Sequence, residues 1–574
     1  MTVEHQAKKK RNLSKGISRS LVSERHPLNV KPSGNSLVFT DSGLNNQKSK
    51  LLGSFRNFND ELILELLSFI EHPQDLLQLG HSSRVFYAFT YDEDLWRKIY
   101  MRKSSKDKNN KSDYPLGINR WLGSWRRTML KLPEPKEALI QLPENLLCSD
   151  ALFRPFQCSK IDYSVALKHL IEDEEESYKL RRTQNVKFGI ERYDEDNLTL
   201  EIFNDQYLQK PFIISKKSNT RWPEWSLPRL LKRFSDVKFR QESVEWPLHF
   251  YADYHVNNSD ESPLYLFDCQ SEAMKKLVEE YKVPSIFSND FFQLFNQKDW
   301  GVNCRPDYRW IIIGPERSGS TFHKDPNFTS AWNANLTGRK LWIMLPPNVK
   351  PPGISTDDTE SEVTSPVGIA EWVLSGFYND TLKLTEFQNC KIGITFPGEV
   401  MFVPSGWWHS VINLEDSVAL TQNFVPDNSL AKVLHFLKSK PEQISGFHLN
   451  KFKKSLINFI NSFSDRINEG NLQIFESFLQ KVKTLDNDED IGEVDCDKLG
   501  RLPIFEFFIE LIKQNGRSQE LEKALRELEN IENEEFYKAG KNIVASKKWG
   551  SLVEGSSVST FSFNFDDDEN DDDL

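Results

Sequence analysis

The chain has 574 residues and a formal net charge of -11, with 38% hydrophobic and 12% aromatic residues. This length exceeds the usual size of one domain, so we expect two or more folded units. The negative charge argues against nucleic-acid binding through phosphates along the whole chain. The 40 Phe and 14 Trp favour a β-rich domain with large side chains packed between its sheets.

The six cysteines form no CxxC pair, and the N-terminus lacks the apolar core of a signal peptide. Neither a disulfide framework nor a zinc finger is indicated, and we expect a reducing intracellular setting. The sequence has no run of 18 apolar residues. We therefore expect a soluble protein that is not secreted and has no membrane partner.

Both ends of the chain are polar. Residues 1–50 are rich in Ser, Asn and Lys and contain "KKKR" at 8–11, which predicts a disordered arm. The basic cluster is either a nuclear address or plain solvated charge, so the nucleus is the expected location and the cytoplasm the alternative. The end, "NFDDDENDDDL", predicts a disordered acidic tail.

The first globular signal is a short helical segment over residues 58–100. Leu62, Leu66 and Ile70 repeat at i, i+4; Asn59 or Asp60 can cap the helix start, and Pro73 is expected to stop the helix after His72. The bland interpretation is any three-helix bundle. The stretch resembles an F-box, although Asn59 stands where that motif usually has Pro. The resemblance is carried by Phe58, Pro73, Leu76, Leu77, Leu79, Ser83, Arg84, Phe86, Tyr87, Leu95 and Trp96. It implies a Skp-type adaptor as partner.

Short strands separated by Gly, Pro and Asn turns recur from about residue 190, for example "YRWIIIG", "GRKLWIMLPP" and "VALTQNFV". This texture predicts a β-sandwich or barrel of the jelly-roll type. After residue 430 the apolar period becomes helical, as in "LNKFKKSLINFINSF". We expect these helices either to pack on the β domain or to pair two subunits as a homodimer.

The predicted fold is therefore a multidomain α+β protein. Its predicted parts are a basic arm (1–50), an F-box (51–102), a linker (103–115), a mostly helical connector (116–189), a β domain (190–430), C-terminal helices (431–555) and an acidic tail (556–574).

His323 and Asp325 form the first candidate site, because residues at i and i+2 of one strand project from the same face. Alone, this spacing is close to a chance match. His409 follows a Pro-Ser-Gly turn and two tryptophans, a context typical of a pocket rim. Without partner ligands, however, a core histidine bonded to the backbone is the better interpretation. Together, two His and one carboxylate match the facial triad of non-haem Fe(II) oxygenases more closely than a zinc site.

Lys340 opens a strand whose two faces both look buried. It needs a buried anion, such as the carboxylate of a dicarboxylic co-substrate, or it reaches solvent at the strand end. Thr421 and Asn423 alternate on a later strand, and Asn333 lies in "SAWNAN". Each could donate hydrogen bonds in the pocket, although each alone is more often structural.

These stretches together resemble the jumonji-C family of Fe(II)- and 2-oxoglutarate-dependent oxygenases. "GSTFHKDP", "TSAWNANLTGRKLWIMLPP" and "GEVMFVPSGWWHSVINLEDSVALTQNF" carry the resemblance, which spans about 190–427. It implies a double-stranded β-helix (cupin-like) fold. The branch it favours contains the phosphatidylserine-receptor protein, a lysyl hydroxylase and reported arginine demethylase.

The resemblance also assigns roles by position. It implies His323, Asp325 and His409 as iron ligands and Lys340 as the partner of the 2-oxoglutarate distal carboxylate, with dioxygen as second co-substrate. The positions implied for co-substrate hydrogen bonds are Asn333, Thr421, Tyr265 and Asn423. Trp332, Trp407 and Trp408 are expected to form apolar walls, and Phe322, Lys324 and Asn335, which depart from the branch, to bear on substrate identity.

The expected function is hydroxylation or demethylation of Lys or Arg side chains in a protein such as a histone or an RNA-processing factor. The rival is a ubiquitin-ligase adaptor, in which the F-box binds a Skp-type protein and the β domain only captures a client. A complete triad with Lys340 favours catalysis, because a binding module has no need of all four residues.

Overall fold

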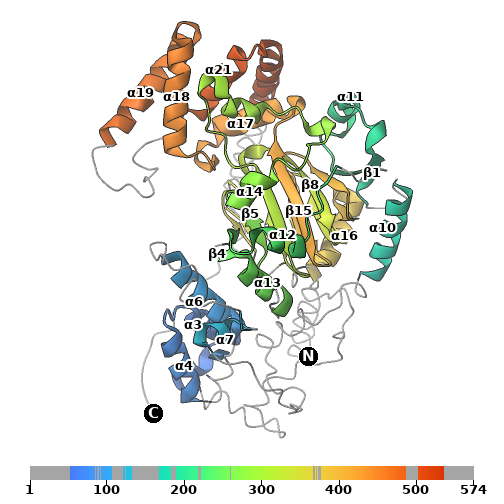
Figure 1. Ribbon diagram of the computed structural model, residues 1–574, viewed down its shortest axis with the longest axis vertical. Helices are drawn as coiled ribbons and strands as arrows, with labels where there is room; N and C mark the ends of the chain where they lie inside the picture. The colour runs from blue at the N-terminus through green and yellow to red at the C-terminus, as the bar shows by residue number, and fades with distance from the viewer. Residues whose placement is uncertain are drawn as a thin grey trace, which may run out of the picture.

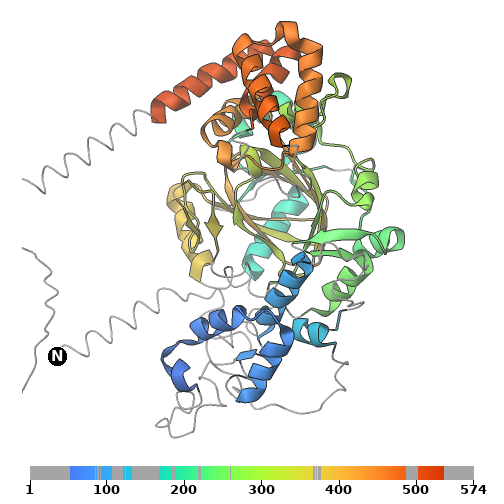
Figure 2. The same ribbon diagram turned by 90° about the vertical axis from the view of Figure 1, so that its left-hand side faces the viewer.

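A computed structural model places the F-box helices at one end of the molecule, a pair of β-sheets in the middle and the C-terminal helices at the other end (Figure 1; Figure 2). The described residues fall within 52–106, 121–131, 167–181, 189–485 and 502–535, with short gaps inside several of these ranges. The expected basic arm, acidic tail, most of the linker and much of the connector lie outside them. Within the described residues, no helix is long and apolar enough to cross a membrane, and Cys269, Cys304 and Cys390 are unpaired.

The N-terminal helices begin as the sequence indicates but end differently. Helix α3 (Asp60–Ser68) is capped by Asn59, whose side-chain oxygen accepts a hydrogen bond from the Leu62 amide at 2.9 Å. The prediction that Pro73 stops this helix was wrong. The helix ends at Ser68, and Pro73 is the first residue of α4 (Pro73–Ser82). A proline is tolerated there because its missing N–H would have had no helical acceptor.

The apolar stripe of α3 does not face the core. Leu62 is 44% and Leu66 40% exposed, whereas Ile63 and Leu67 on the other side are 1% and 5% exposed. Helix α3 therefore has apolar residues on two faces and leaves one of them open.

Helices α6 (Glu93–Lys106) and α7 (Trp125–Leu130) join the F-box to the β domain. Trp125 is fully buried, with ring centroids 5.3 Å from Tyr100 and 5.7 Å from Tyr254. Trp246, from the β domain, donates its indole N–H to the Tyr100 hydroxyl at 2.9 Å. One hydrophobic core runs from the F-box into the larger sheet, so these two regions share an interior.

Two facing sheets form the β domain, as predicted for a jelly roll. The larger sheet contains, in spatial order, β1 (Glu191–Asp194), β2 (Phe212–Ser215), β13 (Val400–Val403), β8 (Ser330–Thr337), β15 (Ser417–Phe424), β6 (Arg309–Gly314), β5 (Leu266–Asp268), β3 (Lys238–Gln241) and β4 (Val244–Pro247). The smaller sheet contains β12 (Lys391–Thr395), β9 (Lys340–Leu345), β14 (Trp408–Asn413) and β7 (Gly319–His323). All pairs are antiparallel except β1 with β2. Three helices lie in the chain among the first strands of the larger sheet: α12 (Leu227–Phe234), α13 (Leu248–Asn257) and α14 (Glu272–Leu277). Between β9 and β12 the chain forms a hairpin of β10 (Ser355–Thr356) and β11 (Val363–Thr364), followed by helix α16 (Gly376–Gln388).

A buried ion cluster fixes the connector helix α10 (Lys168–Leu180) to the β domain. The Arg192 guanidinium on β1 lies between Glu174 of α10, at 2.5 Å, and Glu399, at 3.0 Å. All three side chains are at most 1% exposed. Removing Arg192 would leave two buried carboxylates without a cation, so this contact sets where α10 lies.

The C-terminal helices bury their apolar faces within the chain. They are α17 (Leu430–Ser439), α18 (Leu449–Phe463), α19 (Glu469–Leu485), α21 (Ile504–Gln514) and a helix over 518–535. Phe507 and Phe508 pack against Phe295, which comes from a segment preceding β6. Packing on the β domain, the first of the two expected arrangements, is therefore observed, while pairing of two subunits stays a prediction.

Candidate active site

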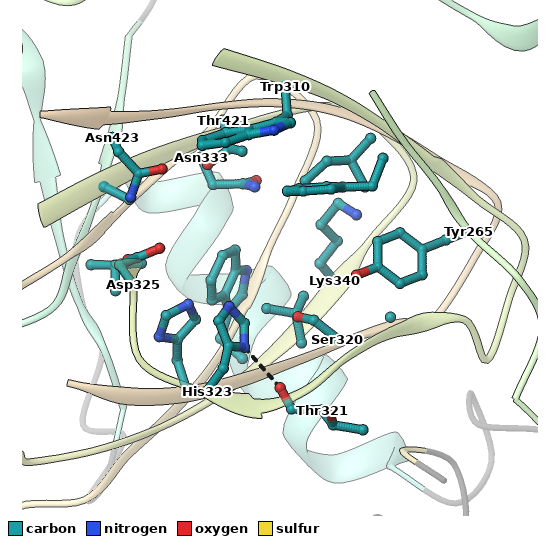
Figure 3. A pocket seen from close by; sticks show the side chains of 18 of the residues that line it. Tyr265, Trp310, Ser320, Thr321, His323, Asp325, Asn333, Lys340, Thr421 and Asn423 are labelled. Carbon is teal, nitrogen blue, oxygen red and sulfur yellow. Dashed lines mark hydrogen bonds between the residues drawn. The ribbon is translucent and has the colours of Figure 1, made fainter. Parts of the chain in front are cut away.

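A cavity of about 570 Å³ lies between the two sheets. Its walls come from β6, β8 and β15 of the larger sheet and from β7, β9 and β14 of the smaller one (Figure 3). All eight site residues predicted from the sequence line it. They are Tyr265, His323, Asp325, Asn333, Lys340, His409, Thr421 and Asn423.

Three candidate metal ligands meet at one end of this cavity. His323 is the last residue of β7 and His409 the second residue of β14, and the two are direct cross-strand partners. Their donor atoms and a carboxylate oxygen of Asp325 all lie within 4.8 Å of one another. The expectation that His323 and Asp325 share a strand was wrong. The strand ends at His323, and Asp325 reaches the same point from the following turn.

Backbone carbonyls orient both imidazoles. His323 Nδ1 lies 2.8 Å from the Thr321 carbonyl oxygen (Figure 3). His409 Nδ1 lies 3.1 Å from the Trp407 carbonyl oxygen. A carbonyl only accepts hydrogen bonds, so in the neutral form of each ring Nδ1 carries the proton and Nε2 the lone pair. This is the tautomer that a histidine needs to bind a metal through Nε2.

Burial shifts the charges of this cluster toward neutrality. Desolvation, helped by nearby His323, holds the pKa of His409 well below its usual value. Desolvation also raises the pKa of Asp325, although His323 and Asn423 partly oppose this rise. The Asp325 Oδ2 atom is buried without a hydrogen-bond partner. A cation held by two neutral imidazoles and this carboxylate would satisfy the unpartnered oxygen.

Lys340 is buried at the start of β9, with 3% of the residue exposed. The alternative in which it reaches solvent at the strand end is therefore wrong. Its Nζ donates to Asn413 Oδ1 at 2.6 Å and to Ser417 Oγ at 3.0 Å. In the described part of the chain no carboxylate lies within ion-pair distance of it, and burial lowers the pKa of Lys340 to about 7. The site thus offers a cation that lacks an anion.

The remaining polar candidates differ in whether their side chains already have hydrogen-bond partners. The Asn333 Oδ1 atom is buried without a partner, whereas Thr421, its cross-strand neighbour, donates to the Trp332 carbonyl at 3.0 Å. Asn423 donates to Thr329 Oγ1 at 2.9 Å. Tyr265 lies across the cavity from the metal ligands, toward Lys340 in the view of Figure 3. Burial raises the pKa of Tyr265 to about 12, so its hydroxyl is a donor at neutral pH.

The tryptophans expected as apolar walls do not line the cavity. Trp332 and Trp408 do not line the cavity, because each precedes a lining residue and so faces the opposite side of its strand. The aromatic walls are instead Trp310, Trp342 and Phe267. Trp407, just before β14, also lies outside the lining.

The three positions expected to bear on substrate identity do not line the cavity either. Phe322 packs on Trp372 in a core cluster, with ring centroids 4.8 Å apart. The Asn335 amide donates to the carbonyls of Gly338 and Thr395, so it stabilises a turn. Lys324 pairs with Glu360 and lies over the Trp408 ring.

The sequence reasoning missed Asn413, which holds Lys340 and is its cross-strand partner. A signal for it was present. His409, Val411 and Asn413 alternate along β14 and all line the cavity, so the period of two that groups residues on one strand face would have found it.

Comparison with known proteins agrees with this geometry. A family model described as a cupin-like domain matches residues 196–429, and an F-box-like model matches 60–102. The "Arginine-specific demethylase JMJ22" of Arabidopsis thaliana is 36% identical over 459 residues, which cover 77% of this chain and 83% of that protein. The chain belongs to the jumonji-C family of Fe(II)- and 2-oxoglutarate-dependent oxygenases.

Other relatives of this jumonji-C protein match over shorter stretches. The "Bifunctional arginine demethylase and lysyl-hydroxylase psr-1" of Caenorhabditis elegans is 35% identical over 41% of this chain and 61% of its own length. The "2-oxoglutarate and iron-dependent oxygenase JMJD4" of Mus musculus is 28% identical over 36% of this chain and 46% of its own length. Both matches are too short to include all of the regions outside the cupin-like domain.

Proposed function

We propose that this protein uses Fe(II), 2-oxoglutarate and dioxygen to hydroxylate or demethylate Lys or Arg side chains of a protein substrate. One observation carries the proposal. His323, Asp325 and His409 converge at one end of a cavity that also holds Lys340, a buried lysine with no carboxylate partner in the described part of the chain. The names of the plant and nematode relatives, an arginine demethylase and a bifunctional demethylase and hydroxylase, support this choice of side chain.

The donor set fits ferrous iron. His323 and His409 would bind through Nε2 and Asp325 through its unpartnered Oδ2. Two His and one carboxylate leave further coordination positions for a co-substrate and dioxygen, which is the arrangement of non-haem Fe(II) oxygenases. When bound, the iron would supply the activation of dioxygen that a protein side chain cannot supply.

Lys340 would bind the distal carboxylate of 2-oxoglutarate. Asn413 and Ser417 already fix its ammonium group, and the co-substrate would bring the missing negative charge. The Asn333 amide N–H2 and the Tyr265 hydroxyl add hydrogen-bond donors at the same cavity. We assign Thr421 and Asn423 a smaller part in co-substrate binding. The Thr421 hydroxyl and the Asn423 amide already donate hydrogen bonds to the protein.

The overall reaction converts 2-oxoglutarate, dioxygen and one C–H bond into succinate, carbon dioxide and a C–OH group. If the carbon is an N-methyl group, the hydroxymethyl product loses formaldehyde and leaves the N–H amine. An ordinary side-chain carbon stays hydroxylated. Trp310, Trp342 and Phe267 would exclude water from the reacting centre.

The F-box supports a second role, recruitment of a Skp-type adaptor. Phe55, Phe58, Leu62, Leu66 and Phe69 are exposed apolar side chains that a partner could cover. This surface is compatible with catalysis, so the adaptor role is added to the oxygenase role and does not replace it. For location we propose the nucleus, on the basic cluster at 8–11.

A turnover assay tests the proposal. The full chain with Fe(II), 2-oxoglutarate and methylated or unmodified Lys and Arg peptides should form succinate, with a matching gain of oxygen or loss of methyl by mass spectrometry. His323→Ala should abolish this turnover. His169→Ala is the matched control, because that side chain is 96% exposed and lies on α10. Equal succinate formation by wild type and His323→Ala would sink the enzyme proposal.

A further inference from the structure

The segment that carries Tyr265 is held from two sides. Asp260, at its start, is buried, and its Oδ2 accepts hydrogen bonds from the Trp125 indole of α7 and the Tyr254 hydroxyl of α13, each at 2.7 Å. The Leu264 amide donates to the same Tyr254 hydroxyl at 2.8 Å. Tyr265 follows directly, just before β5. The backbone before Tyr265 is therefore clamped between the β domain and the end of the F-box region.

Arg97, on F-box helix α6, contacts the same segment three residues before Tyr265. Its Nη1 donates to the Ser262 carbonyl oxygen at 2.8 Å, and its Nη2 pairs with Glu242 Oε2 at 3.2 Å. The Arg97 side chain is 18% exposed. One guanidinium thus joins three parts of the chain: α6, the turn after β3 and the Tyr265 segment.

Glu242 gives this contact an electrostatic consequence. Its side chain is 40% exposed and lines the same cavity as Tyr265 and Lys340. The negative charge of Glu242 is close enough to Tyr265 to add to the rise in that hydroxyl's pKa. A dicarboxylate entering the Tyr265 end of the cavity would therefore meet a like charge, which costs affinity unless a cation offsets it.

We propose that Arg97 is a positioning residue through which the F-box helix prepares the 2-oxoglutarate end of the pocket. It holds the segment that carries Tyr265 and offsets the charge of Glu242. This inference rests on the proposed function, because it takes 2-oxoglutarate as the ligand near Lys340. It makes the F-box region a part of the oxygenase site as well as a docking module.

Equilibrium binding of 2-oxoglutarate to the full chain tests the inference without turnover. The measurement is calorimetry with Mn(II) in place of iron, accompanied by the melting temperature of each variant. Arg97→Ala should weaken 2-oxoglutarate binding on the order of tenfold, because it leaves Glu242 uncompensated. Arg97→Lys, which keeps the charge, should lose much less. Lys98→Ala is the matched control, because the neighbouring lysine on α6 is 50% exposed and pairs only loosely, at 4.0 Å, with Glu65.

Substitution of Glu242 distinguishes an electrostatic role of Arg97 from a purely structural one. Glu242→Gln alone should tighten binding by about threefold, since Arg97 then adds net positive charge near the ligand. In the Arg97→Ala background the same change should restore most of the lost affinity. A purely structural role of Arg97 predicts neither effect, and Glu242→Gln carries the test even if Arg97→Ala fails to fold.

The outcomes distinguish this inference from the proposed function. If wild type binds no 2-oxoglutarate, the proposed function fails. If wild type binds it and Arg97→Ala binds equally well, or Glu242→Gln neither tightens binding nor restores it, the inference alone is overturned.

Discussion

His323 and His409 lie directly opposite each other on the antiparallel strands β7 and β14, with ring centroids 4.2 Å apart. Each imidazole Nδ1 contacts the carbonyl of the residue two positions before it, Thr321 in β7 and Trp407 just before β14. The same local arrangement thus occurs on both strands. It fixes both rings through backbone atoms alone, so the metal-binding geometry exists before any metal arrives.

This pairing predicts metal-dependent stability. Mn(II) at about 100 times its Kd should stabilise the protein by about 2.7 kcal/mol, because it binds the folded chain only. His409→Ala should lose this stabilisation. The effect in wild type should also decline in acid, where protons compete for the imidazoles and the carboxylate. Thermal melts with and without Mn(II) measure it, with His169→Ala as control; an undiminished shift in His409→Ala would contradict the assignment.

Lys340 predicts that 2-oxoglutarate binding takes up a proton. Burial lowers its pKa to about 7, so much of the free protein carries a neutral lysine at pH 8. A bound carboxylate favours the charged form and raises that pKa again. Affinity for 2-oxoglutarate should therefore fall as pH rises from 7 to 9.

Calorimetry in two buffers of different ionisation enthalpy would measure this proton uptake. Lys340→Met should remove the uptake and weaken binding strongly. The sign for stability is opposite to that of a paired lysine. The unfolded pKa of about 10.4 lies above the folded one, so the co-substrate-free protein gains stability as pH rises from about 7 toward 10. Stability that falls over this window would show that Lys340 has an undetected anionic partner.

The sequence predicted the site better than its surroundings. His323, His409 and Lys340 could be found because their residue types are chemically specific and their strands are strongly apolar. The walls could not, because Trp332 and Trp408 are adjacent to lining residues and only the strand register decides which side faces the cavity. Asn335 was expected to bear on substrate identity, but its side-chain amide donates hydrogen bonds to the carbonyls of Gly338 and Thr395. Thr395 is 60 residues away in the chain, so no local pattern indicates this structural role.

The order of the F-box and the β domain could be predicted from the sequence, but the hydrophobic core that they share could not. The F-box pattern and the β-rich texture are local signals, each predicted from its own stretch. The shared core depends on Trp125 meeting Tyr254 and on Arg97 meeting Glu242, contacts more than 100 residues apart in the chain. The hydrophobic periodicity within either segment does not predict such long-range contacts.

The open face of α3 predicts that adaptor binding can be removed without unfolding. Leu62→Lys and Leu66→Lys place charge on residues that are 44% and 40% exposed, so stability should change by no more than about 0.5 kcal/mol. Capture of a Skp-type adaptor by the full chain should be lost. Ile63→Ala, at a residue only 1% exposed, is the contrast, because it should lower stability instead. Undiminished adaptor capture by both lysine variants would count against this face.

Turnover provides a second readout for the same variants. Because Leu62 and Leu66 face away from the cavity lining, succinate formation in the absence of adaptor should match wild type. A loss of turnover equal to the loss of capture would instead mean that the charge disturbed the shared core.

Trp125 predicts that the F-box and the β domain unfold together. Its indole is fully buried between residues of both regions and donates to Asp260, so Trp125→Ala should cost about 3–5 kcal/mol. Trp125→Phe keeps much of the packing and loses mainly the hydrogen bond, so it should cost less. Because one core spans both regions, denaturant unfolding should show one transition that shifts as a whole in both variants. Two separate transitions, with only the first shifted by Trp125→Ala, would mean that the F-box is an independent unit joined to the oxygenase by contact alone.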